Sequence, residues 1–228
     1  MAIREPGIVK GNRGVSADRR NTEAGLSKAQ RETLERVEKE AGNLDREVLT
    51  IVAPDGSIKG QYRGNASSVN IPDSEDYKFK DAVVTHNHPG QLTTTLWGDT
   101  LATRVGQSLS SGDVLAAIEG DVKEIRAVTK GGYIYSLKRP ANGWGINKTP
   151  GWDERLANEF RMTEYRYDRQ YLYKNPERAN EPRSWAQEQE ARVNTADGAR
   201  GKVLARHNTV KELANKYGWK YTRRRWKQ

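Results

Sequence analysis

The chain of 228 residues contains no cysteine, only three histidines and no long apolar run. Without cysteine there can be no disulfide bond and no thiolate metal site, so any metal ion must be held by histidine and carboxylate groups. No stretch approaches the roughly 18 apolar residues that a membrane-spanning helix needs. Residues 1–14 also lack the apolar stretch of a signal peptide. We therefore expect no membrane partner and synthesis in a reducing cytoplasm.

Hydrophobic residues are also scarce, at 35% of the chain, and the charge is unevenly placed. Residues 1–140 carry 20 Lys and Arg against 19 Asp and Glu, whereas residues 141–228 carry 19 against 11 and hold five of the six tryptophans. This composition predicts a compact core in only part of the chain. The basic second segment could contact nucleic acid or an acidic protein surface, or it could be a solvated helical face.

The pattern of apolar residues predicts an α/β fold, a mixed sheet with flanking helices. A helix should begin after an N-cap at Ser27 and end at Gly42, with Leu34 and Val37 facing inward. A second helix should open after Ser110. Strands are predicted at residues 46–52, 57–62, 81–85, 124–129 and 133–137.

Three segments are expected along the chain. Residues 1–25 are rich in Arg, Gly and Asn and are interpreted as a flexible arm, and residues 26–140 as the compact domain, which ends at Pro140. Residues 141–228 are interpreted as a basic helical extension that contains Trp. In it, helices are predicted at 153–173, 185–193 and 202–217, followed by a basic tail at 222–227, and His207 is expected to be solvated.

Two of the three histidines, His86 and His88, lie one residue apart at the end of the apolar run that begins at Val83. Residues i and i+2 of a strand point to the same side, so both imidazoles can face one point, while Thr85 and Asn87 face away. Imidazole is a common neutral ligand of zinc, and a catalytic zinc needs three protein ligands and an open position for water. The pair therefore predicts a metal site.

Three further residues can complete a hydrolytic site. Asp113 opens the helix after Ser110 and supplies a carboxylate, and Glu47 lies at the start of an earlier strand. A carboxylate near the metal can move a proton from water to a leaving amine, and a hydroxyl can stabilise an oxyanion. The alternative is that Ser110 and Asp113 form an ordinary helix cap and that Glu47 is an exposed charge at a sheet edge.

The pattern His-x-His-Pro at residues 86–89, followed by Ser-x-x-Asp at 110–113 and preceded by a glutamate on a strand, resembles the JAMM motif of JAB/MPN metallopeptidases. The sequence around His86 is most similar to the RadC branch and to JAB-type domains of phage head-associated and mobile-element proteins. The resemblance covers about residues 45–140 and implies a deaminase-like α/β/α sandwich. It implies that His86, His88 and Asp113 bind zinc, that Glu47 is the general acid/base, and that Ser110 assists the oxyanion.

The usual spacing of that motif would select Asp99 instead of Asp113. Asp99 is preceded by Leu96, Trp97 and Gly98, so the serine of the motif would be missing. We favour Asp113 because it has the serine, although this choice requires an insertion of 14 residues. The loop at residues 90–107 would then lie beside the metal and could gate the cleft.

The resemblance implies a zinc-dependent peptidase or isopeptidase that acts on a protein substrate. It further implies an association with a phage particle or a location in the cytoplasm of a bacterial host. The extension at 141–228 would then dock on a large assembly or contact nucleic acid. The alternative is a structural virion protein that keeps the JAB scaffold and cleaves nothing.

Overall fold

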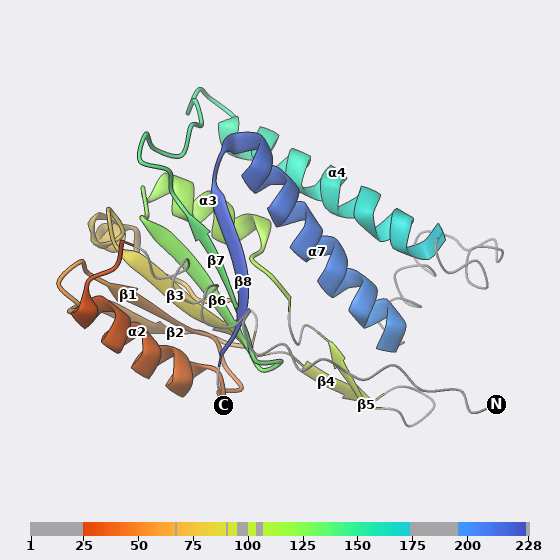
Figure 1. Cartoon of the computed structure of the whole chain (residues 1–228), viewed down its shortest axis with the longest axis horizontal. Coiled ribbons are helices and arrows are strands. Elements are labelled where there is room, and N and C mark those ends of the chain that lie inside the picture. Colours follow the sequence, from red (N-terminus) through yellow and green to blue (C-terminus); the bar gives the residue numbers. More distant parts are fainter. Residues whose placement is uncertain are drawn as a thin grey trace, which may run out of the picture.

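The computed structural model describes residues 25–66, 68–89, 91–94, 100–103, 107–173 and 196–226. Its main feature is a six-stranded mixed sheet in the order β2-β1-β3-β6-β7-β8 (Figure 1). The elements are α2 (Lys28–Ala41), β1 (Val48–Val52), β2 (Ile58–Arg63), η1 (Asp73–Lys78), β3 (Val83–His88), β4 (Gln91–Thr94), β5 (Thr100–Thr103), α3 (Ser111–Glu119), β6 (Glu124–Thr129), β7 (Tyr133–Lys138), α4 (Trp152–Tyr173), α7 (Ala196–Tyr217) and β8 (Lys220–Arg225). The predicted α/β class with a mixed sheet and flanking helices is confirmed.

Helix α2 begins and packs as its sequence predicts. The hydroxyl of Ser27 accepts a hydrogen bond from the Gln30 N–H at 3.0 Å, which satisfies one of the free donors of the first turn. Leu34 and Val37 are only 1% and 2% exposed. With Val52 and Val83 of the sheet, Leu34 forms a small apolar cluster, so α2 covers one face of β1 and β3.

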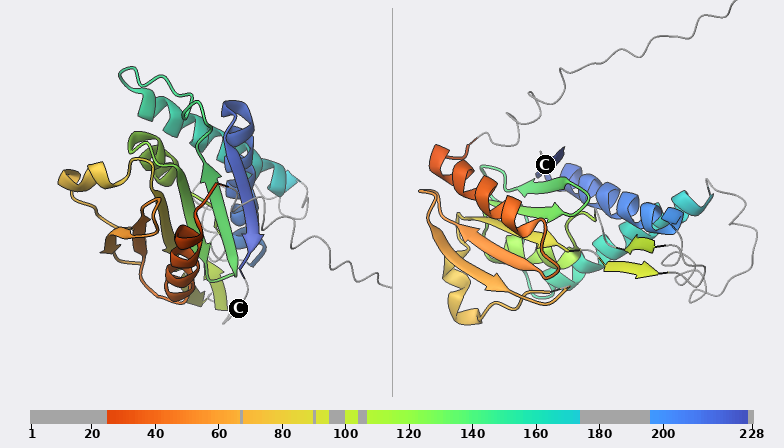
Figure 2. Two further views of the ribbon diagram at one scale, coloured as in Figure 1. Left: turned by 60° about the vertical axis from the view of Figure 1, so that its left-hand side comes forward. Right: turned by 90° about the horizontal axis from the view of Figure 1, so that it is seen from below.

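The alternation of side chains along the strands separates the two faces of the sheet. Val83 faces α2, whereas Val84 belongs to the larger core on the opposite face, together with Ile125 and Leu137. Helices α3, α4 and α7 supply the other side of this core. Figure 2 shows that α4 and α7 lie side by side. Helices therefore cover both faces of the sheet.

Strand β3 lies in the middle of the sheet and carries the histidine pair. It pairs antiparallel with β1, with Leu49 opposite His86, and parallel with β6, with Ala127 beside His86. Residues 83–87 are buried and His88 is half-buried. Strand β3 is thus central and buried on both faces, and its pairing on both sides fixes the direction of both imidazoles.

The C-terminal segment is part of this sheet. Residues 220–225 form β8, which pairs antiparallel along β7 at the sheet edge (Figure 1), so the predicted basic tail at 222–227 is wrong. Trp144 and Trp219 are buried in the main core, and the Trp219 Nε1–H donates to the Trp144 carbonyl at 2.7 Å. The extension predicted at 141–228 thus packs on the compact unit through α4, α7 and β8, and Pro140 does not end the packed core.

A buried group of charges explains how a strand rich in arginine can lie in the sheet. Arg126 contacts Glu38 of α2 at 3.1 Å and Glu124 at 2.7 Å, and all three are almost fully buried. Lys138 lies 3.3 Å from Glu124, and Arg224 of β8 lies 3.8 Å from Glu38. Buried charges are tolerated when they are paired, so these contacts anchor β8 to the α2 face.

Some predictions concern residues outside the described part of the chain. These are residues 1–24 of the expected arm, Asp99, and the expected helix at 185–193. Within the expected gating loop at 90–107, the described residues include β4 and β5, which pair antiparallel as a separate two-stranded sheet. None of the described helices is long and apolar enough to cross a membrane.

Candidate metal centre

The side chains of His86 and His88 meet on the face of the sheet that carries α3. Their Nε2 atoms lie 3.0 Å apart and their rings meet edge to face at 66°. Thr85 and Asn87 point away from this pair: Thr85 donates to Glu38 of α2 at 3.2 Å, and the Asn87 amide oxygen accepts from the Val48 N–H of β1 at 2.7 Å. The predicted convergence of the two imidazoles is confirmed.

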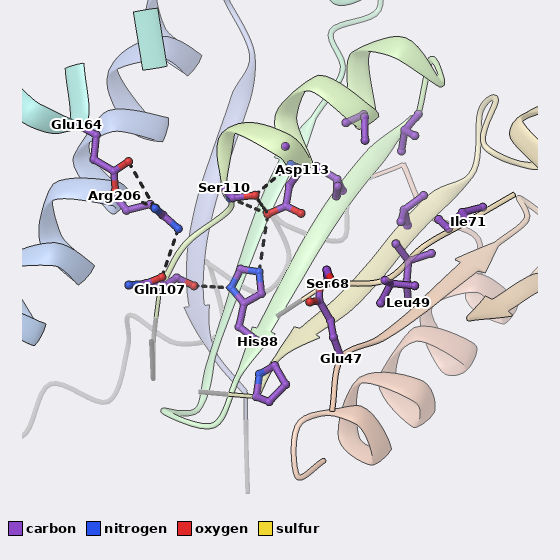
Figure 3. Close-up of a pocket in the computed structure, with 18 of the residues that line it drawn as sticks. Glu47, Leu49, Ser68, Ile71, His88, Gln107, Ser110, Asp113, Glu164 and Arg206 are labelled. Atoms are coloured by element: carbon purple, nitrogen blue, oxygen red, sulfur yellow. Dashed lines mark hydrogen bonds and ion pairs between the residues drawn. The ribbon is translucent and has the colours of Figure 1, made fainter. Parts of the chain in front are cut away.

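Asp113 approaches both histidines from the first turn of α3. Its Oδ1 lies 3.2 Å from His86 Nε2. Its Oδ2 lies 3.7 Å from His88 Nε2, and Figure 3 shows this contact. The segment before α3 contacts His88 through the Gln107 carbonyl, and the first turn of α3 brings Asp113 to the histidine pair. Among the described residues, Asp113 is therefore the aspartate at this position.

Ser110 and Asp113 also form a reciprocal helix cap. The Ser110 hydroxyl accepts from the Asp113 N–H at 3.2 Å, and the Ser110 N–H donates to Asp113 Oδ2 at 2.6 Å. The same hydroxyl donates to Oδ2 at 2.8 Å. Asp113 is thus both a helix-capping residue and a neighbour of the histidines, because the cap orients its carboxylate toward them.

Glu47 lies just before β1 and is only 9% exposed. Its backbone is fixed by two hydrogen bonds across the hairpin, from its N–H to the Asn65 carbonyl at 2.7 Å and from the Gly64 N–H to its carbonyl at 2.8 Å. Its carboxylate lies 4.0 Å from His86 Nε2. Glu47 is thus not the exposed edge charge that the alternative interpretation expected.

The described residues include one group of histidines and carboxylates that could hold a metal ion. It consists of Glu47, His86 and His88, whose ligand atoms all lie within 4.8 Å of one another. The contacts of Asp113 with both histidines add a second carboxylate to the same point. The structure therefore brings Glu47, His86, His88 and Asp113 together, with Ser110 bonded to Asp113, whereas the alternative ligand Asp99 lies outside the described residues.

The charges of these groups depend on one another. Burial alone would lower the pKa of His86, but the carboxylates of Asp113 and Glu47 raise it above its ordinary value. Burial would raise the pKa of Asp113, but the two imidazoles hold it well below its ordinary value. Without a metal ion, the site therefore favours an ionised Asp113 beside a protonated His86.

His88 is oriented by Gln107, a residue that no sequence pattern indicates. His88 Nδ1 lies 3.0 Å from the Gln107 carbonyl, which can only accept a hydrogen bond, so Nδ1 carries the proton and Nε2 is free to bind a metal. The Gln107 side chain accepts from Arg206 of α7 at 3.2 Å, and Arg206 pairs with Glu164 of α4 at 2.9 Å. No signal in the sequence links these positions.

The next residue along this segment is held by the C-terminal strand. Ser108 Oγ lies 2.6 Å from the hydroxyl of Tyr221 in β8, and that hydroxyl lies 2.8 Å from His207 Nδ1. The expectation that His207 is solvated is therefore wrong. Burial and the nearby positive charges of Arg223 and Lys211 lower the pKa of His207 to about 4, so it is neutral at neutral pH. Helix α7 and strand β8 together fix the segment that carries Gln107 and Ser110.

A cleft of about 1000 Å³ opens beside the cluster (Figure 3). Glu47, His88, Ser110 and Asp113 all line it, so a ligand in the cleft can reach the candidate metal centre. The remaining walls come from the loop after β2, from the sheet, and from α3, α4 and α7.

Comparisons with protein-family models, with curated proteins and with solved structures gave no match to this chain.

Proposed function

We propose that this protein is a zinc-dependent hydrolase of peptide or isopeptide bonds, with the JAB/MPN sandwich fold and the JAMM arrangement of ligands. The observation that carries the proposal is the approach of Asp113 to His86 and His88 at a point where Glu47 lies 4.0 Å from His86. These four side chains come from the residue before β1, from β3 and from α3, as the resemblance of the sequence motif requires.

The number and spacing of the donor groups fit zinc. In a tetrahedral site with bonds of about 2.05 Å, neighbouring ligand atoms lie about 3.3 Å apart. The two imidazole Nε2 atoms are 3.0 Å apart, and the nearest Asp113 oxygens lie 3.2 and 3.7 Å from them. Two imidazoles and one carboxylate leave the fourth position open, which is typical of catalytic zinc sites.

The residues around the site suit amide hydrolysis. Bound zinc would lower the pKa of a coordinated water to about 7 and polarise a carbonyl group. Glu47 lines the cleft, so its carboxylate can accept a proton from the attacking water and pass it to the nitrogen of the leaving amine. Glu47 is farther from His86 than Asp113 is, at 4.0 Å against 3.2 Å, which favours the role of base for Glu47 and that of ligand for Asp113.

The proposed role of Ser110 requires a change in its hydrogen bonds. Its hydroxyl is engaged with Asp113 as both donor and acceptor, so contact with an oxyanion requires it to turn from the carboxylate to the substrate. Ser110 does line the cleft. Its proposed contribution is therefore to kcat, and Ser110→Ala should lower kcat more than it changes KM.

The wider context rests on the sequence resemblance. We propose a protein substrate and an association with a phage particle or with the host cytoplasm. Docking of residues 141–228 on a large assembly or on nucleic acid remains a prediction. The alternative, a structural virion protein that cleaves nothing, shares the same scaffold and is separated from the enzyme by the experiment below.

The test compares zinc content and peptide hydrolysis in three variants. The full chain should bind about one zinc per molecule, and the double variant His86→Ala/His88→Ala should bind none. Glu47→Gln should keep its zinc and lose hydrolysis of a randomised peptide library by about 10²- to 10⁴-fold. Glu119→Gln, an exposed carboxylate on α3 outside the cleft, is the matched control and should behave like the parent chain.

Two outcomes would contradict the proposal. Full zinc occupancy in the double histidine variant would place the metal elsewhere. The structural alternative would be favoured if the parent chain binds zinc at this site but hydrolyses no peptide, either as the purified chain or within a phage particle.

A further inference from the structure

The cleft is chemically different on its two sides, and the candidate metal centre lies between them. Figure 3 shows Leu49 and Ile71 on one side of His88 and Asp113, and Gln107, Arg206 and Glu164 on the other. The first side is walled by apolar residues, and we call it the apolar arm. Its accessible lining residues are Leu49, Val69, Ile71 and Ala116, and buried residues of the main core lie behind them.

The apolar arm lies directly beside the metal ligands. Leu49 is paired with His86 across β1 and β3, and Val84 precedes His86 by two residues on the same face of β3. Directly opposed residues of an antiparallel pair lie about 5 Å apart. An extended peptide advances about 3.3 Å per residue, so it covers this distance in one or two residues. A substrate side chain bound in the arm would thus belong to a residue no more than two positions from the bond held at the metal.

Small residues on α3 keep this arm open. Gly112 and Ala116 are exposed on the helix face that lines the cleft, and Ala117 lies behind them. A Cβ atom added at Gly112 would meet only Ser110 Oγ, at 3.6 Å, so the space in front of the helix is open there. Water that contacts the apolar walls of this arm is readily displaced by an apolar side chain.

The charged pair on the opposite side of the cleft should select little between substrates, although Arg161, Met162, Tyr165 and Asp168 of α4 also line the cleft. Arg206 and Glu164 are ion-paired with each other at 2.9 Å, and Arg206 also donates to Gln107. Their charges are therefore largely compensated within the protein. This pair should therefore contribute little to substrate selection, whereas the apolar arm beside the metal ligands can select an apolar side chain.

We infer that the substrate is an extended polypeptide that places a bulky apolar side chain (Leu, Ile, Met or Phe) in the apolar arm, within two residues of the bond to be cleaved. This inference rests on the proposed hydrolase function for the cleavage step. The binding preference itself is independent of catalysis, because the arm is formed by residues that take no part in the proton transfer.

The test measures peptide binding and peptide cleavage separately. The zinc-loaded Glu47→Gln chain is applied to an array of ten-residue peptides with one randomised position, and binding should be at least about tenfold stronger for peptides with one bulky apolar residue than for their Ser counterparts. The zinc-loaded parent chain is given the same peptides in solution, and mass spectrometry locates the cleaved bonds. Cleavage should lie within two residues of the apolar side chain.

Two substitutions on α3 provide the matched comparison. Ala116→Trp fills the arm from an exposed helix position, so it should reduce the binding and cleavage of apolar peptides at least about tenfold while zinc affinity and Tm stay unchanged. Glu119→Trp adds the same side chain at an exposed position outside the lining of the cleft and should change neither.

The outcomes separate this inference from the proposed function. Array binding without preference for apolar residues, or unchanged selectivity in Ala116→Trp, would overturn the inference even if the parent chain cleaves peptides. Preferential binding of apolar peptides without any cleavage would support the apolar arm and contradict the hydrolase proposal.

Discussion

Replacing Asp113 with asparagine should abolish tight zinc binding while helix α3 keeps its cap. In the structure Asp113 contacts His86 and His88 through its oxygens and also accepts the Ser110 N–H at 2.6 Å. An asparagine amide oxygen can still accept that hydrogen bond, but it carries no charge and is a poor zinc ligand. Replacing Ser110 with alanine should weaken the helix cap and preserve zinc binding, because it removes the capping hydroxyl and leaves the carboxylate.

The expected magnitudes follow from these contacts. Loss of an outer partner of a metal ligand typically costs 10- to 100-fold in affinity, so loss of a ligand charge should cost more than about 100-fold. Ser110→Ala removes an N-cap worth about 1 kcal/mol, which lowers the Tm of a chain of this size by about 2–4 °C. Its zinc affinity should stay within about tenfold of the parent, because the carboxylate remains in place.

Competition with a chromogenic chelator measures zinc affinity, and circular dichroism of the metal-free chains measures Tm. Zinc affinity of Asp113→Asn within a few-fold of the parent would refute the assignment of Asp113 as a ligand. If Glu47→Gln then loses zinc, the ligand set is Glu47, His86 and His88, and Asp113 is only a capping residue.

Three further predictions concern acidity, the outer contacts and stability. The carboxylates of Asp113 and Glu47 outweigh burial and raise the pKa of His86 above 6.5, so protons should already compete with zinc at a pH above 6.5. Zinc affinity, measured by calorimetry, should therefore fall as the pH decreases. A zinc affinity that begins to fall only below pH 6 would contradict this. Tyr221→Phe removes a hydrogen bond worth about 1 kcal/mol from Ser108 and should weaken zinc binding about fivefold, but not in a Ser108→Ala background. Additive losses in the double variant would show that the two residues act separately. Arg126→Met leaves two buried carboxylates with fewer counter-charges and should lower the free energy of unfolding in urea by about 3 kcal/mol, whereas a loss below about 1 kcal/mol would contradict the paired arrangement.

Local patterns in the sequence predicted the parts of the site that depend on neighbours along the chain. The two-residue period of a strand placed His86 and His88 on one face, and Thr85 and Asn87 on the other. The N-cap at Ser27 and the inward positions of Leu34 and Val37 follow from helix geometry within one element. Such features are readable because the interacting residues are close in sequence.

The course of the C-terminal segment could not be predicted in this way. A run of arginines is usually solvated, because a buried charge is costly unless it is paired. In the structure Arg224 reaches Glu38, and Arg223 lies over the ring of Tyr133 at 4.2 Å from its centroid. These partners precede the arginines by 90 residues or more, so only the paired sheet shows that the run is a strand.

The contacts of Asp113 include one that the local sequence predicts and others that depend on tertiary packing. Its cap with Ser110 spans three residues, and the sequence by itself determined that contact. Its approach to His88, 25 residues earlier, depends on how α3 packs against the sheet, and so does the support of the adjoining segment by Tyr221. The sequence therefore identified the chemical groups and their local directions. Only the tertiary structure decided that they meet at one point, because that meeting depends on packing between elements distant in the chain.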